Sequence, residues 1–332
     1  MPTLDIIITH YKEPYEVGRK LFEIIGLQRG VDFGDFKVTV VNDGGNRLPE
    51  EELKKLGYEV EQTDIEHGGV SKARNTGIDR TSAPFLMFCD FDDTFTNIYA
   101  LRDMMSVLPC DYDMLWTRLL VEDCLDGKKH FYETPEKQRF VFVHGKIYRR
   151  QFLKDQNIRF DERMTFQEDS QFNATITART DFRRIGELKA PMIPYAWIRR
   201  QNSVTNSGRD DEAEYWHFRR NLNITEENRG DGDKYSGMIT RTAYDAYLMF
   251  YGKRLGANMK MRILREFIPW IVERKELFGK VPDDIMEQIM DMSRYELLDP
   301  GEKLKDDPET VRKWIGIITE EEKHNGNLHD KP

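Results

Sequence analysis

Short apolar runs alternate with amphipathic segments over the first hundred residues of the chain. Four runs have the length and the β-branched or aromatic content of strands: residues 4–9 (LDIIIT), 36–41 (FKVTVV), 58–63 (YEVEQT) and 84–89 (PFLMFC). The first, second and fourth are nearly continuous apolar runs, as strands covered on both faces are. The third alternates, so we expect it nearer a sheet edge.

The segments between these runs have helical periodicity. Residues 15–28 repeat apolar side chains at i, i+3 and i+4, which predicts a helix packed on the sheet. Helices near 70–80 and 97–108 are expected to do the same. This alternation predicts an α/β fold with a mainly parallel sheet flanked by helices.

The pattern loosens after residue 110. It predicts a strand at 113–120 and helices at 147–155 and 167–179. From about residue 209 only long, charged, amphipathic segments follow, at 211–223, 236–256 and 281–293. We therefore expect two domains, an α/β domain at 1–208 and a helical C-terminal region at 209–332.

Composition narrows the class of protein. With 39% hydrophobic and 33% charged residues in 332, the chain is a water-soluble globular protein with a sizeable core. A net charge of −9 argues against coating nucleic acid or an anionic membrane by bulk charge. Three cysteines without C-x-x-C spacing indicate reduced thiols. Because the N-terminus lacks signal-peptide features and no long apolar run occurs, we expect a cytoplasmic protein without a transmembrane segment.

An acidic cluster ends the fourth predicted strand. Asp90 and Asp92, with Asp93 beside them, lie in 89-CDFDDTF-95, at the carboxyl end of a buried strand, where α/β folds bind ligands. Closely spaced carboxylates suit Mg²⁺ or Mn²⁺, and such a cation can neutralise a diphosphate. The alternative is a solvated acidic turn that merely ends a strand, and the cluster alone does not decide between them.

Three other segments carry candidate ligand groups. Asp43 precedes two glycines, which lets a flat ligand approach the backbone, although a self-capping turn has the same pattern. Thr9 and Tyr11 follow the first strand, where Tyr11 either stacks on a base or simply packs. Arg74 lies on a helix preceded by a Gly pair, a typical anion site. Neither a Walker A loop nor G-x-G-x-x-G occurs, which excludes the P-loop and NAD-type sites that these motifs form.

In their order along the chain, these segments resemble family 2 glycosyltransferases of the GT-A fold. The matching stretches are 9-THYKEP-14, 42-NDGG-45, 67-HGGVSKARNTGI-78, 89-CDFDD-93 and 166-FQEDSQF-172. The resemblance covers about residues 4–205 and implies a Rossmann-like GT-A sheet. Asn42 replaces the first Asp of the usual V-D-D-G, and Gly45 replaces the usual Ser. The Q-x-x-R-W signature of processive synthases is missing, which argues against a processive membrane synthase.

The resemblance also implies roles for single residues. Thr9 and Tyr11 would line the uracil pocket, Asp43 would accept from the uracil ring, Arg74 would lie beside the base or diphosphate, Asp90 would face the ribose and metal, and Asp92 would be the principal metal ligand. Asp169 would be the catalytic base, with Glu168 as the alternative. Arg199, Arg200 and Ser203 are candidates to contact the donor diphosphate or the acceptor.

Together these features predict a metal-dependent, inverting, hexosyltransferase-type enzyme that uses a UDP-sugar and Mn²⁺ or Mg²⁺. Five basic doublets suggest an anionic acceptor such as a polyol-phosphate chain, with other glycans and DNA also considered: 128–129, 149–150, 183–184, 199–200 and 219–220. The alternative is a nucleotide-sugar-binding regulatory or scaffolding protein without turnover. A nucleotidyltransferase would need a Gly-rich basic loop after the first strand, which is absent. Residues 209–332 are expected to shape the acceptor side or to form a homo-oligomer.

Overall fold

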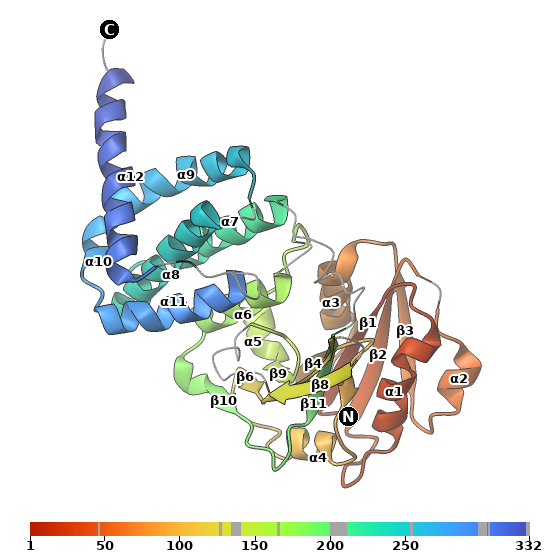
Figure 1. Ribbon diagram of the computed structural model, residues 1–332. Helices are drawn as coiled ribbons and strands as arrows, with labels where there is room; N and C mark the ends of the chain where they lie inside the picture. Colours follow the sequence, from red (N-terminus) through yellow and green to blue (C-terminus); the bar gives the residue numbers. More distant parts are fainter. Residues whose placement is uncertain are drawn as a thin grey trace. The chain divides into compact units, whose positions relative to one another are not determined.

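The computed structural model describes residues 1–45, 47–125, 128–133, 141–164, 167–199, 211–252, 255–297, 304 and 306–329. The chain divides into two compact units, Met1–Gly208 and Arg209–Pro332 (Figure 1). The described part of the first unit alternates strands and helices, and that of the second is helical.

A seven-stranded sheet with the order β10-β6-β9-β4-β1-β2-β3 forms the centre of the first unit. Its strands are β1 (Leu4–His10), β2 (Phe36–Asp43), β3 (Val60–Ile65), β4 (Phe85–Asp90), β6 (Met114–Trp116), β9 (Lys146–Arg149) and β10 (Ile185–Glu187). Strands β4, β1, β2 and β3 are parallel neighbours, and β9 is antiparallel to β4 and β6. The mainly parallel sheet and the edge position of β3 are therefore confirmed.

Helices cover both faces of this sheet (Figure 1). They are α1 (Tyr15–Gly26), α2 (Glu50–Lys54), α3 (Gly69–Arg80), α4 (Ala100–Met105), α5 (Arg150–Asp155) and α6 (Glu168–Arg179). Ile6 and Ile8 of β1 pack into one core with α1 and α4, while Ile7 packs into a second core with α3, α5 and α6. Because both faces are buried, the strands need continuous apolar runs, which explains the pattern in the sequence.

A second, smaller sheet has the order β5-β11-β7-β8. It contains β5 (Thr94–Phe95), β7 (Leu119–Leu125), β8 (Lys128–Glu133) and β11 (Tyr195–Arg199). Strand β11 runs antiparallel to β5 and parallel to β7. Because β5 begins directly after the acidic cluster at the end of β4, this pairing brings β11 to that cluster.

Two sequence predictions for the first unit were wrong. The strand expected at 113–120 is divided into β6 and β7, which belong to different sheets. Residues 147–149, expected to be helical, lie in β9, and the helix begins only at Arg150. Strand β9 is held by ladders to β4 and β6, so non-local pairing overrides its local pattern.

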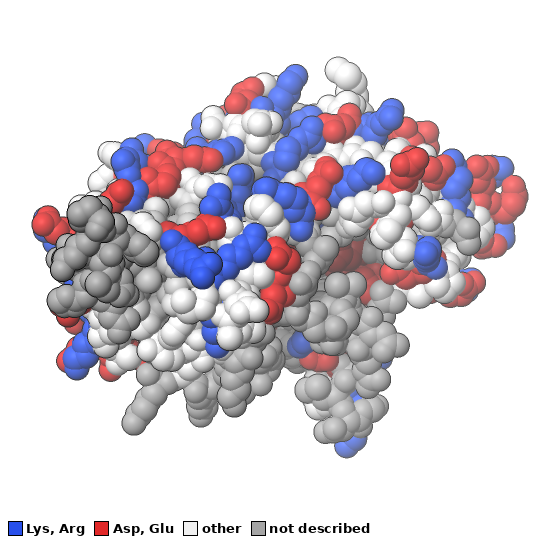
Figure 2. Space-filling view, turned by 90° about the horizontal axis from the view of Figure 1, so that it is seen from above, with Lys and Arg blue, Asp and Glu red and all other residues white. Residues whose placement is uncertain are grey.

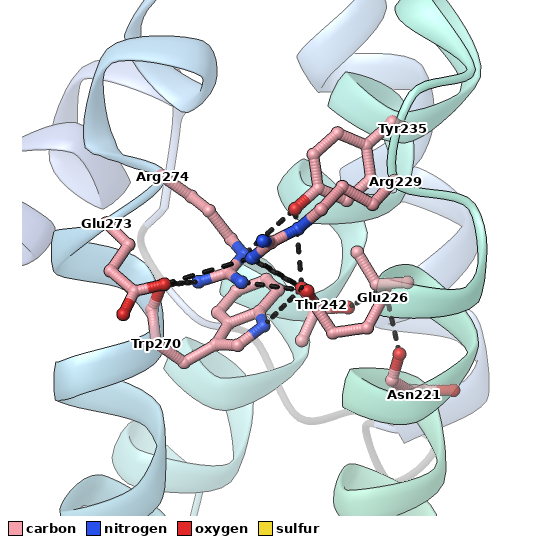
Figure 3. Close-up of polar contacts among 9 residues, drawn as sticks. Asn221, Glu226, Arg229, Tyr235, Thr242, Trp270, Glu273 and Arg274 are labelled. Atoms are coloured by element: carbon pink, nitrogen blue, oxygen red, sulfur yellow. Dashed lines mark hydrogen bonds and ion pairs between the residues drawn. The ribbon is translucent and has the colours of Figure 1, made fainter.

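The second unit consists, where described, of α7 (Asp211–Glu227), α8 (Gly232–Tyr251), α9 (Ala257–Val272), α10 (Lys275–Gly279), α11 (Asp283–Leu297) and α12 (Pro308–His329). A shared core of buried aliphatic and aromatic side chains holds these helices together. Arg274 donates from Nε and Nη2 to the two carboxylate oxygens of Glu226, both at 2.8 Å, and Trp270 Nε1 donates to Glu226 Oε1 at 2.8 Å (Figure 3). The bidentate pair of Arg274 with Glu226 joins the end of α7 to the start of α10, and Trp270 joins it to α9.

Among the described helices, none combines the length and apolar character needed to cross a bilayer.

Candidate active site

The carboxyl ends of β1, β2 and β4 place three predicted site residues along one edge of the sheet. Thr9 is in register with Asp90 of β4 and with Val41 of β2, two residues before Asp43. Ligands of parallel α/β sheets bind at this edge. The strand order β4-β1-β2 thus brings Thr9, Asp43 and Asp90 into one region.

Asp43 is anchored by the N-terminus of α3. Its Oδ1 accepts from the Gly68 N–H at 2.7 Å, and its Oδ2 accepts from the Gly69 N–H at 2.9 Å. His67 Nδ1 lies 2.9 Å from the same Oδ2, and its ring stacks on Tyr11 with centroids 4.2 Å apart. Tyr11 and Asp43 therefore share a neighbour, His67. Sequence reasoning missed His67, because its position before the Gly pair was the only sign of a role.

The two departures from the family pattern have structural reasons. Asn42 Nδ2 donates to Asp64 Oδ1 at 2.9 Å and to Gln62 Oε1 at 3.2 Å, which an aspartate could not do. At Gly45, a Cβ atom would lie 2.7 Å from the backbone N of Lys12, so the loop after β1 needs glycine there.

Arg74 joins α3 to two acidic residues of the site. Its side chain is 3% exposed, and it donates from Nη2 to Asp90 Oδ1 at 3.0 Å and from Nη1 to Glu168 Oε1 at 2.7 Å. Burial opposes the charge, but the carboxylates of Asp90, Glu168 and Asp169 raise the Arg74 pKa above its ordinary value. Arg74 therefore stays charged and links β4 to the start of α6.

A series of polar contacts extends from Asp90 to β11. His144 Nε2 lies 3.0 Å from Asp90 Oδ2 and 3.6 Å from Asp93 Oδ2. Asp93 in turn accepts from the Tyr195 hydroxyl and from the Ile198 N–H, both at 2.9 Å. Sequence reasoning gave Asp93 only a place in the acidic cluster and gave His144 no role, because the two residues that meet here are distant in the sequence.

The pKa values of these residues depend on one another because their charged groups lie close together. Burial works against ionisation of Asp90, but His144 and Arg74 hold the Asp90 pKa well below its usual range. Burial also disfavours a charged ring at His144, yet the charge and hydrogen bond of Asp90 raise the His144 pKa to about 9. Burial raises the Asp93 pKa to about 8 despite the opposing charge of His144.

The acidic turn has the donor chemistry of a divalent-cation site. Among the described residues, Asp90, Asp93 and His144 bring three ligand-type atoms within 4.8 Å of one another. However, His144 Nε2 already contacts Asp90 Oδ2, and both Asp93 oxygens already accept hydrogen bonds. Asp90 keeps 30% of its side chain exposed, and Asp92 is half-buried in the turn after it. Their carboxylates fit Mg²⁺ or Mn²⁺, whereas His144 acts as a donor to Asp90.

Glu168 and Asp169 begin α6 but have different surroundings. Glu168 is bound to Arg74, whereas Asp169 Oδ1 accepts from the Ser170 backbone N–H at 2.7 Å. Burial, followed by the charge of Glu168, raises the Asp169 pKa to about 7. A carboxylate that exchanges its proton near neutral pH is suited to general base work.

The remaining predicted residues contribute less to the described site. Arg200 and Ser203 lie outside the described residues. Arg199 donates to Asp123 Oδ2 at 3.0 Å and lies over the Trp197 ring. Most of the basic doublets pair with acids: Lys129 with Glu122, Arg149 and Arg184 with Asp113, Arg150 with Asp5, Arg183 with Asp181, and Arg219 with Glu266. On the face in Figure 2, basic and acidic side chains are likewise interspersed.

Comparison with known families agrees with this geometry. The model of glycosyl transferase family 2 matches residues 5–166, which contain the ends of β1, β2 and β4 described above. Residues 5–166 belong to glycosyl transferase family 2. The family predicted from the sequence is thereby confirmed.

Two relatives that the chain matches are named as glycosyltransferases. The chain is 26% identical over 231 residues to EpsJ of Bacillus subtilis, described as an uncharacterized glycosyltransferase, covering 62% of this chain and 63% of EpsJ. It is 25% identical over 307 residues to TarS of Staphylococcus aureus, a poly(ribitol-phosphate) beta-N-acetylglucosaminyltransferase, covering 87% of this chain and 51% of TarS. The chain thus spans only about half of TarS.

A crystal structure of TarS residues 1–349 in complex with UDP-GlcNAc has the same fold. It superposes with a TM-score of 0.68 at 17% identity and covers 98% of this chain and 92% of the TarS fragment. The predicted GT-A fold is confirmed by this similarity.

Proposed function

We propose that this chain is a metal-dependent, inverting glycosyltransferase that moves a sugar from a UDP-sugar to a hydroxyl acceptor. The observation that carries the proposal is the division of roles at the start of α6. Arg74 binds Glu168, while Asp169, with its pKa raised to about 7, can take up a proton. Membership of family 2 and the nucleotide-sugar complex of TarS support the same reaction class.

The proposed chemistry is a single displacement. Asp169 takes the proton of the acceptor hydroxyl as its oxygen attacks the anomeric carbon of the donor. The bond between that carbon and the diphosphate oxygen breaks, UDP departs, and the anomeric configuration inverts. A cation held by Asp90 and Asp92 would stabilise the charge of the departing diphosphate.

For the donor, we assign the nucleobase to the edge formed by Thr9, Tyr11 and Asp43. Tyr11 is 38% exposed and offers an aromatic surface, while Asp43 is fixed by backbone donors of α3. Because TarS has been crystallised with UDP-GlcNAc, UDP-N-acetylglucosamine is the first donor to test.

For the acceptor, we propose a glycan or a polyol-phosphate chain, with TarS as the precedent for the latter. The pairing of most basic doublets with acids favours recognition by a few side chains over broad attraction of a polyanion. We assign residues 209–332 to the acceptor side or to self-association, because the donor motifs all lie before residue 209.

A donor screen tests this function. UDP-, GDP- and dTDP-sugars would be incubated with Mn²⁺ or Mg²⁺, with and without acceptor, and nucleotide release measured. We expect release from a UDP-sugar that EDTA abolishes. Metal-dependent UDP binding without turnover on any glycan or polyol-phosphate acceptor would instead support the non-catalytic alternative.

A further inference from the structure

Lys146 is a buried lysine that the reaction above does not use. It lies in β9, its exposure is only 2%, and its Nζ donates to the backbone carbonyl of Phe142. A lysine is almost never this buried unless it is paired with a charge. Among the residues that the structure describes, however, no carboxylate oxygen lies within 4.0 Å of Lys146 Nζ, the limit for an ion pair.

The carbonyl that Lys146 contacts also supports α6. Asn173 Nδ2 donates to the same Phe142 oxygen at 2.9 Å, and Tyr148 of β9 donates its hydroxyl to Asn173 Oδ1 at 2.9 Å. Asn173 is four residues after Asp169 in α6, so the two share a helix face, one turn apart. The ammonium of Lys146 therefore lies under the face of α6 that carries Asp169.

We propose that Lys146 is a positioning residue that keeps the Asp169 carboxylate in its proton-accepting form. The inference rests on the proposed function, because it concerns the base of that reaction. Electrostatics supports it: burial lowers the Lys146 pKa to about 7, and the charge of Asp169 is what opposes this. The largest influences on the Asp169 pKa are burial and the charge of Glu168, which raise it, and Arg74, His144 and the Ser170 N–H, which lower it.

The pH profile separates this role from a purely structural one. We expect Lys146→Met to move the acid limb of kcat/KM upward by a fraction of a pH unit, because removing a nearby positive charge makes Asp169 easier to protonate. Lys146→Arg, which keeps a positive charge, should not move the limb upward, and neither should the control Lys154→Met on the exposed face of α5. A Lys146→Met enzyme that is slower by the same factor at every pH would overturn the proposal.

A reciprocal measurement does not require that the Lys146→Met variant folds. The side-chain NMR resonance of Lys146, assigned by its loss in Lys146→Arg, would be titrated in the wild-type protein and in Asp169→Asn. If the two groups are coupled, the midpoint for Lys146 falls when the Asp169 carboxylate is removed. Equal midpoints would refute the proposal. Because this titration does not depend on turnover, it can fail while the proposed function stands, and the reverse also holds.

Discussion

Arg74 Nη1 donates to Glu168 Oε1 at 2.7 Å, a contact between residues 94 positions apart. The contact ties α3 to the first residue of α6 and commits the Glu168 carboxylate to Arg74. Its neighbour Asp169 accepts from the Ser170 backbone N–H instead. Two adjacent acids that look equivalent in the sequence therefore differ in what they can do.

This difference predicts opposite outcomes for two amide substitutions. Asp169→Asn should bind UDP with unchanged affinity and lose about 10²- to 10⁴-fold in transfer rate, because an amide keeps the shape but cannot accept the proton. Glu168→Gln should weaken donor binding by loosening Arg74 while keeping measurable transfer. Calorimetry with UDP and single-turnover kinetics check both, and a dead Glu168→Gln beside an active Asp169→Asn would reverse the assignment.

Asp169 should also make activity and stability depend on pH in opposite directions. Its pKa is raised from 3.8 to about 7, so kcat/KM should rise with pH through about 7 as the base loses its proton. The same raised pKa contributes to the stability of the fold below about pH 4. This contribution is lost as pH rises through 7. Asp169→Asn should therefore have the higher Tm at pH 8 and nearly the same Tm at pH 4. If the variant is no more stable than wild type at pH 8, burial of the ionised Asp169 carboxylate does not lower the stability of the fold.

Substitutions of two neighbouring aspartates in the acidic turn should have different effects, one on metal binding and the other on folding. Asp92→Ala should abolish transfer and remove the Mn²⁺-dependent part of UDP affinity with little change in Tm. Asp93→Ala should instead lower the stability by about 2 kcal/mol or more, since it leaves the Tyr195 hydroxyl and the Ile198 N–H buried without their acceptor. Titrations of UDP with and without Mn²⁺, beside urea denaturation, test the pair. Unchanged Mn²⁺-dependent affinity in Asp92→Ala would rule out its role as ligand.

Restoring the family's usual residue at position 42 should harm this protein. Asn42→Asp replaces a donor to Asp64 and Gln62 by a second acceptor, so we expect a loss of about 1–3 kcal/mol in urea denaturation. The control Asn223→Asp, on the exposed side of α7, should change stability by less than about 0.5 kcal/mol. Equal stability of Asn42→Asp and wild type would mean that these hydrogen bonds contribute nothing.

The helical unit can be tested by truncation. A chain ending at residue 208 should still bind UDP, while transfer to the acceptor falls or the oligomer size changes. Size-exclusion chromatography with light scattering and an acceptor assay measure these effects. Full transfer at the same oligomer size would remove both roles that we assign to residues 209–332.

Features that depend on a short stretch of sequence could be predicted, whereas features that depend on contacts between distant residues could not. Strands β1, β2 and β4 could be predicted because burial on both faces requires a continuous apolar run. Strand β9 could not, since 146-KIYR-149 is charged at both ends and is held only by ladders to β4 and β6. Asp43, Asp90 and Asp169 belong to ordered motifs, whereas His67 and His144 acquire their roles only through partners that are distant in the sequence.

The most direct test of the central claim follows release of UDP from UDP-N-acetylglucosamine in the presence of Mn²⁺ and a polyol-phosphate or glycan acceptor, in parallel for wild type and Asp169→Asn. The account predicts stoichiometric UDP and glycosylated product from the wild type, with the anomeric configuration inverted by NMR, and donor binding without product from the variant. A wild-type protein that binds the donor but forms no product, or an Asp169→Asn variant that forms it at the wild-type rate, would contradict the account.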